Sequence, residues 1–168
     1  MISILSACGI NKNKEKQATF VKQQTSASND IIVLYTNDVH CAVLEDEENG
    51  VLGYSKVAGY KKELENQGNT VVLVDVGDAI QGGTIGTLSK GSDIVDIMNT
   101  VGYDIAIPGN HEFDYGMNTF FDLTKQAEYS YISCNFMNLE KKKPVLQPYK
   151  IMQLADKKVA FVGISTPK

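Results

Sequence analysis

The chain has 168 residues, enough for one ordinary domain with a substantial buried core. Its residues are 43% hydrophobic and 21% charged, as in a typical globular protein, and the net charge of −4 gives no basis for nucleic-acid binding. All 16 basic residues are lysines. Arginine is the side chain that clamps phosphates and carboxylates with two parallel hydrogen bonds. If the protein has such a clamp, it would have to lie outside these residues.

The N-terminal stretch MISILSAC is a short apolar run that ends at Cys8. Small residues between an apolar stretch and a cysteine resemble the lipobox of bacterial lipoproteins, in which the cysteine is acylated and becomes the new N-terminus. The basic start of a secretory signal is missing, so we interpret residues 1–8 as a partial signal remnant; the alternative is a disordered tail with an accidental cysteine. Residues 9–30 are polar and predict a flexible tether. We therefore expect an exported protein, periplasmic or on the cell surface, tethered to the membrane through Cys8.

From Ile31 onward, apolar runs rich in β-branched residues alternate with amphipathic stretches. The runs that predict strands are residues 31–36, 70–76, 103–107 and 131–136. The stretches that predict helices are residues 54–67, 92–102 and 117–129. This alternation predicts an α/β fold with a mostly parallel sheet and helices on both faces. Further along, residues 149–154 and 158–166 predict a β-hairpin or two strands joined by a short connection.

Polar side chains that can bind metals or move protons lie at or just after the end of each predicted strand. They are Asp38 and His40, then Asp78, then Asn110, His111 and Asp114, and finally Asn135. Both histidines of the chain are among them. In open α/β sheets, ligands bind beyond the carboxyl ends of the strands. We therefore expect these residues to form one shared site.

The residue types suit divalent metal ions. Asp38 and His40 are two positions apart, so in an extended strand exit their side chains would point to the same side and form half of a site for a first-row ion. Asp78 follows a strand and could bridge two ions, whereas Asp75 lies inside an apolar run and is interpreted as structural. Asn110 could give its carbonyl oxygen to a second ion.

His111 suits a different role, because it follows Asn110 directly and its side chain would point elsewhere. Asp114, three residues on, could accept a hydrogen bond from the His111 ring and hold its tautomer. A histidine paired in this way can stabilise or protonate the oxygens of a reacting phosphoryl group. The alternative interpretation is a loop at the start of a helix with a capping aspartate.

Three other features of the sequence leave more than one interpretation open. Glu112 could bind an asparagine or backbone groups, or face solvent. The glycines at 82, 83 and 86 could bring the backbone close to a substrate or form a plain flexible loop. Cys41 is interpreted as a loop or core thiol rather than a soft metal ligand, and Cys134 as a small buried hydrophobe.

The motifs LYTNDVH, DVGDAIQGG, GNHEFDYG, SCN and VGISTP, in this order, resemble the 5'-nucleotidase family, a branch of the calcineurin-like metallophosphoesterases. The resemblance implies that residues 31–168 are the N-terminal part of a catalytic domain with the αββα sandwich of that superfamily. The implied activity is hydrolysis of nucleotide phosphate esters by a water that two metal ions activate. The implied cofactors are two divalent ions, from among Zn, Mn, Mg, Co and Ca.

The resemblance also implies a role for each matching residue. The pair Asp38 and His40 would hold the first metal ion, Asp78 would bridge both ions, and Asn110 would hold the second. The pair His111 and Asp114 would stabilise the transition state at the phosphate. These roles agree with those suggested by the residue types alone.

Those four ligands leave both ions under-coordinated. In the family, later histidines, including a Gly-His-x-His motif, complete the two metal sites, and a separate C-terminal domain binds the nucleoside and supplies arginines. We therefore expect the 168-residue chain to be a fragment that is inactive or weakly active alone. The missing later histidines are one departure from the family pattern. Cys41 is a second, because the family pattern leads us to expect a small polar residue at that position.

Other functional classes remain as alternatives. A sulfur-compound hydrolase of the same superfamily would use the same N-terminal motifs. A non-catalytic module that binds metal or nucleotide would use the same side chains without turnover. A Rossmann-type redox domain is disfavoured, because no G-x-G-x-x-G motif follows the first predicted strand.

Overall fold

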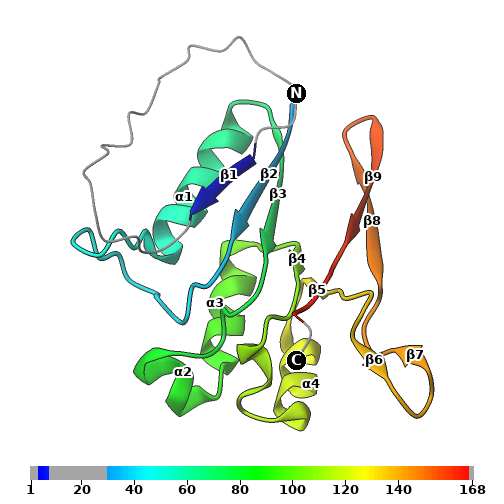
Figure 1. Ribbon diagram of the computed structural model, residues 1–168. Coiled ribbons are helices and arrows are strands. Elements are labelled where there is room, and N and C mark those ends of the chain that lie inside the picture. Colours follow the sequence, from blue (N-terminus) through cyan, green and yellow to red (C-terminus); the bar gives the residue numbers. More distant parts are fainter. Residues whose placement is uncertain (1–3, 8–29, 167–168) are drawn as a thin grey trace.

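The computed structural model describes residues 4–7 and 30–166, and this part of the chain is built on one parallel sheet (Figure 1). The five strands lie in the order β1-β2-β3-β4-β5, and every neighbouring pair is parallel. The strands are β1 (Ile4–Ala7), β2 (Ile31–Thr36), β3 (Thr70–Asp75), β4 (Ile105–Ala106) and β5 (Ser130–Tyr131). Each strand therefore lies beside the next one along the chain.

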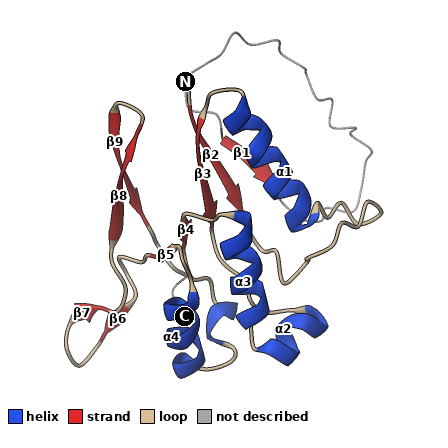
Figure 2. Cartoon of the chain, turned by 180° about the vertical axis from the view of Figure 1, so that it is seen from behind, coloured by secondary structure: helices blue, strands red, loops and turns tan. Residues whose placement is uncertain are grey.

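The helices lie on one face of this sheet (Figure 2). They are α1 (Gly53–Asn66), α2 (Gly83–Ser89), α3 (Ser92–Val101), α4 (Met117–Gln126) and the 3₁₀ helix η1 (His111–Phe113). In α3, the buried residues Ile94, Val95 and Met98 recur at helical spacing and pack in the main core. The helix ends at Gly102, whose φ of +81° is a left-handed conformation that glycine adopts without strain.

A hairpin covers the opposite face, where helices were expected. Its strands are β8 (Tyr149–Leu154) and β9 (Lys157–Val162), paired antiparallel as predicted from the sequence. Leu154 is buried against Val72 and Ile105 of the sheet, in a second apolar cluster. The α/β class and the mostly parallel sheet are confirmed, but the second layer of the described region consists of strands. A shorter hairpin, β6 (Met137–Asn138) with β7 (Lys143–Pro144), precedes it.

The strand order explains why the helices share one face. Right-handed crossovers place a helix on a given face according to the direction in which the next strand is added. Here every new strand is added on the same side of the previous one, so successive crossovers put their helices on the same face. The apolar strands still need cover on the other face, and the β8–β9 hairpin provides it.

The predicted strands and helices are present, with shorter ends where the pattern was weak. The first two strands agree within one residue, whereas β4 and β5 have only two residues each. Ile4–Ala7, assigned above to a signal remnant, forms β1 beside β2. Cys8 and most of the predicted tether, residues 9–29, lie outside the described residues. No helix in the described ranges is long and apolar enough to cross a membrane.

Sequence patterns did not predict α2, which occupies the glycine-rich stretch. Glycines disfavour a helix intrinsically, but close packing requires those at positions 82 and 86. A Cβ on Gly82 would lie 2.4 Å from the carbonyl oxygen of His40, and one on Gly86 would lie 2.4 Å from the sulfur of Cys41. The stretch is therefore neither a flexible loop nor a bare backbone surface, because it packs a short helix against the loop that carries His40.

Candidate active site

The loop after β2 carries Asp38 and His40 and is hydrogen-bonded to the loop after β3. The N–H of Asp38 donates to the carbonyl of Gly77 at 3.0 Å, and the N–H of His40 donates to that of Asp78 at 2.9 Å. Both Asp38 and His40 adopt left-handed φ values, +54° and +46°, so the predicted extended strand exit is wrong. The expected proximity nevertheless arises from the turn, with His40 Nε2 3.9 Å from Asp38 Oδ1.

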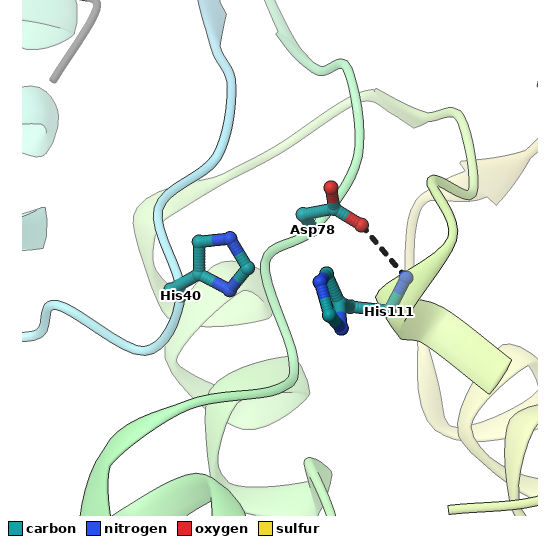
Figure 3. Close-up of side chains that lie close together, drawn as sticks. All are labelled: His40, Asp78 and His111. Atoms are coloured by element: carbon teal, nitrogen blue, oxygen red, sulfur yellow. Dashed lines mark hydrogen bonds between the residues drawn. The ribbon is translucent and has the colours of Figure 1, made fainter. Parts of the chain in front are cut away.

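Asp78 is placed by two glycines and by the N-terminus of η1. Gly77, at φ +110°, turns the chain out of β3, and Asp78 follows at φ +62°. The Oδ1 atom of Asp78 accepts a hydrogen bond from the backbone N–H of His111 at 2.8 Å (Figure 3). A Cβ on Gly109 would lie 2.4 Å from that same Oδ1 atom, so only glycine leaves room for the carboxylate. The loops after β3 and β4 therefore meet at Asp78.

His40, Asp78 and His111 converge to form a metal-competent cluster (Figure 3). One donor atom from each residue lies within 4.8 Å of the other two. The two imidazole rings are 5.1 Å apart between centroids and meet edge to face at 72°. Sequence reasoning pointed the His111 side chain away from the metal ligands, but the structure brings its ring into the same cluster.

The donor set fits a divalent metal ion. His40 Nδ1 lies 3.0 Å from the carbonyl oxygen of Gln81, and because a carbonyl only accepts, this contact places the proton on Nδ1 and leaves Nε2 free to bind a metal. Imidazole nitrogens together with a carboxylate are common ligands for zinc and other first-row ions. Asp38, within 3.9 Å of that Nε2, adds a second carboxylate at the edge of the cluster.

His111 also makes the expected contact with Asp114. Its Nδ1 lies 2.6 Å from Asp114 Oδ2, across the three residues of one helical turn. The hydrogen bond to the Asp114 carboxylate is the main cause that raises the pKa of His111 above its usual value. The pairing therefore favours the protonated imidazolium, which can donate to an anionic oxygen.

The two asparagines predicted at this edge differ in their contacts. Asn110 is half-buried and directly precedes η1, next to the cluster in sequence. Asn135 is held by other polar groups: its Oδ1 accepts from the N–H of Ser165 at 2.8 Å and from the hydroxyl of Ser133 at 3.0 Å. Its Nδ2 donates to the carbonyl of Ser165 at 2.7 Å. Asn135 therefore fixes the exit of β5 to the segment after β9.

Comparison with known proteins identifies the family of this chain. Residues 31–163 match the family model of the calcineurin-like phosphoesterases. The chain belongs to this family. The match begins with β2 and ends just after β9, so it includes every residue of the cluster.

The chain is similar to nucleotidases and to a sulfur-compound hydrolase. The chain is 32% identical over 157 residues to a snake venom 5'-nucleotidase from Gloydius brevicauda, covering 84% of this chain and 26% of that protein. An NAD nucleotidase structure from Haemophilus influenzae aligns with a TM-score of 0.68 and 26% identity, over 80% of this chain and 26% of the other. A sulfate thiohydrolase, SoxB, from Thermus thermophilus shares the fold, with a TM-score of 0.63 and 23% identity over 68% of this chain and 21% of the other. The chain thus spans about a quarter of the length of the venom relative.

Glu112 is the site-loop residue whose role the sequence left most open. Its side chain is 1% exposed and accepts hydrogen bonds from backbone N–H groups of both site loops. Burial raises the pKa of its carboxyl above the usual value, although the hydrogen bonds oppose this shift. Glu112 lies in the GNHE motif, outside any apolar run with helical or strand periodicity, so no pattern in the sequence would have predicted its burial.

Cys41 and Asp75 are core residues, as the sequence suggested. Burial raises the pKa of the Cys41 thiol to about 11, so the thiol stays protonated and is a poor metal ligand. Asp75 is 2% exposed and its Oδ1 accepts from the Thr36 hydroxyl at 2.9 Å. Burial also raises the pKa of Asp75 well above its usual value. Cys134, predicted to be buried, is only half-buried.

Proposed function

We propose that this chain contributes the first part of an active site that hydrolyses phosphate esters of nucleotides. The observation that carries the proposal is the convergence of His40, Asp78 and His111 at the ends of three strands, within a calcineurin-like phosphoesterase domain. The relatives named 5'-nucleotidase and NAD nucleotidase support nucleotides as the substrate class. The likeness to SoxB concerns the fold alone and does not favour a sulfur substrate.

The proposed metal ligands are those that the sequence suggested. Asp38 and His40 would hold one divalent ion, Asp78 would bridge two, and Asn110 would hold the second. The 3.9 Å contact of His40 with Asp38 and the position of Asp78 between the two histidines support this assignment. When bound, two divalent ions supply Lewis-acid polarisation of the phosphoryl oxygens and an acidified water.

The His111–Asp114 pair is proposed to act on the phosphate directly. Asp114 holds the ring through Nδ1, which leaves Nε2 as the nitrogen that faces a ligand. Because the pairing favours the imidazolium, Nε2–H would donate to a phosphoryl oxygen and stabilise the charge that develops there. Asp114 would then orient the ring without touching the substrate.

We further propose that the 168-residue chain alone hydrolyses its substrate slowly. The proposed ligands Asp38, His40, Asp78 and Asn110 are too few to saturate two divalent ions, and the chain holds no histidine besides His40 and His111. The relatives are about four times longer than the segment that this chain matches.

Export through a lipidated Cys8 is a separate proposal that rests on the sequence alone. Cleavage before Cys8 would remove β1, so the sheet of the mature protein would begin at β2. Mass spectrometry of the N-terminal peptide after expression in a bacterial host tests it. An acylated Cys8 at the new N-terminus is the expected result, and an intact, unmodified Met1 peptide would contradict it.

Metal binding by the 168-residue chain tests the proposed site. Isothermal titration calorimetry with Mn²⁺ is expected to detect binding that Asp78→Asn weakens by at least about tenfold. The matched control is Asp156→Asn, which removes an exposed carboxylate at the turn of the β8–β9 hairpin. If Asp78→Asn binds Mn²⁺ as tightly as the control does, the proposed site is wrong.

A further inference from the structure

A buried carboxylate joins the loops that follow β3 and β4. The Oε2 atom of Glu112 accepts hydrogen bonds from the backbone N–H of Gly109 at 2.6 Å and from that of Asp78 at 2.9 Å. Its Oε1 atom accepts the N–H of Ala79 at 2.9 Å, with the N–H of Ile80 at 3.5 Å. Glu112 is itself 1% exposed, so these bonds are shielded from water. One side chain therefore satisfies donors from both loops.

We propose that Glu112 is a positioning residue of the phosphoesterase site, which holds the carboxylate of Asp78 against the loop that carries His111. This inference rests on the proposed function, because Glu112 acts through Asp78 and has no role at the metal or the substrate itself. Asp78 has a left-handed φ of +62°, a conformation that costs an L residue free energy. Hydrogen bonds to an anionic acceptor are stronger than neutral ones and offset this cost.

The geometry requires a carboxylate rather than an amide at position 112. Both oxygens of Glu112 face backbone donors: Oε2 faces the N–H groups of Asp78 and Gly109, and Oε1 faces that of Ala79. A glutamine has one accepting oxygen, so in either orientation its NH₂ group would oppose an N–H donor. A side chain that only filled the space would tolerate Glu112→Gln, because the two side chains have nearly the same volume.

The main test compares Mn²⁺ affinity in the 168-residue chain. We expect Glu112→Gln to weaken Mn²⁺ binding by about 10–100-fold, as is typical when a residue that orients a metal ligand is replaced. The control is Glu128→Gln, which neutralises an exposed glutamate after α4 and is expected to leave the affinity unchanged.

The outcomes separate this inference from the proposed function. Wild-type affinity in Glu112→Gln, together with weakened binding in Asp78→Asn, overturns the positioning role and leaves the metal site in place. Binding that Asp78→Asn does not weaken, or no Mn²⁺ binding by the wild type, overturns the metal site and with it the positioning role.

A second measurement needs no variant and therefore does not depend on whether Glu112→Gln folds. The amides of Asp78, Ala79 and Gly109 lie in loops, where exchange with solvent is fast unless a specific acceptor protects them. Hydrogen exchange followed by NMR in the wild-type chain is expected to show slow exchange at all three. Fast exchange at Ala79 and Gly109 would show that the Glu112 carboxylate does not hold the loops, and would overturn the proposal.

Discussion

Replacing Gly109 with alanine tests how closely the two site loops must approach. The added Cβ would lie 2.4 Å from Asp78 Oδ1 and 2.8 Å from Asp78 Cγ, whereas ordinary contact begins at 3.4 Å. The carboxylate must therefore move by about 1 Å, several times the ~0.2 Å tolerance of metal–ligand distances. The neighbouring Asp78 N, 3.0 Å from the added atom, prevents an easy backbone shift.

We expect Gly109→Ala to weaken Mn²⁺ binding by at least about tenfold and to destabilise the fold by about 1–3 kcal/mol through overpacking. Calorimetric titration measures the first effect and urea unfolding the second. Gly59→Ala is the matched control, because a Cβ there meets nothing within 4 Å and alanine favours the α1 helix. Unchanged Mn²⁺ affinity in Gly109→Ala would refute the close approach of Asp78 to the loop after β4.

Three further predictions concern proton binding, thiol reactivity and the core. In the metal-free chain, NMR titration of His111 should give a pKa above 6.5, and Asp114→Asn should lower that pKa. The free energy of unfolding that this pair contributes is therefore present below pH 6.5 and is lost as the pH rises through the raised pKa of His111. A His111 pKa that Asp114→Asn leaves unchanged would contradict the pairing. Cys41 should react with iodoacetamide more slowly than the half-buried Cys134 at pH 8, as peptide mass spectrometry can measure, and urea should abolish the difference; equal rates in the folded chain would show that the Cys41 thiol is accessible. Phe120→Ala should cost about 3–5 kcal/mol in urea unfolding, because this ring is fully buried under the sheet; a loss below about 1 kcal/mol would show that the α4 face is loosely packed.

Local patterns predicted most of the secondary structure. Continuous apolar runs predicted β2 and β3 within one residue, because strands covered on both faces have no polar side to interrupt the pattern. The helix α2 was missed for the opposite reason. Gly82 and Gly86 are required by contacts with His40 and Cys41, far away in sequence, and local propensity does not report such contacts.

The sequence by itself determined that polar residues would gather at the carboxyl ends of the strands, because parallel strands share one direction and their exits share one edge. This rule predicts that His40, Asp78 and His111 lie at one edge of the sheet, and the structure brings the three together there. The three-residue spacing of His111 and Asp114 separately suggested the contact between them, since residues three apart in a helical turn are neighbours.

Only the tertiary structure decided the strand order, the direction of the His111 ring and the role of Glu112. The strand order put the helices on one face and a hairpin on the other, and no periodicity in a sequence encodes which side of a strand its successor joins. The Glu112 carboxylate accepts the backbone N–H of Asp78, and the Asp78 carboxylate accepts the backbone N–H of His111, each across more than 30 residues of sequence. These hydrogen bonds form only where the two loops meet in space. Their donor–acceptor distances must be right to within a fraction of an ångström, and residue types alone do not fix them.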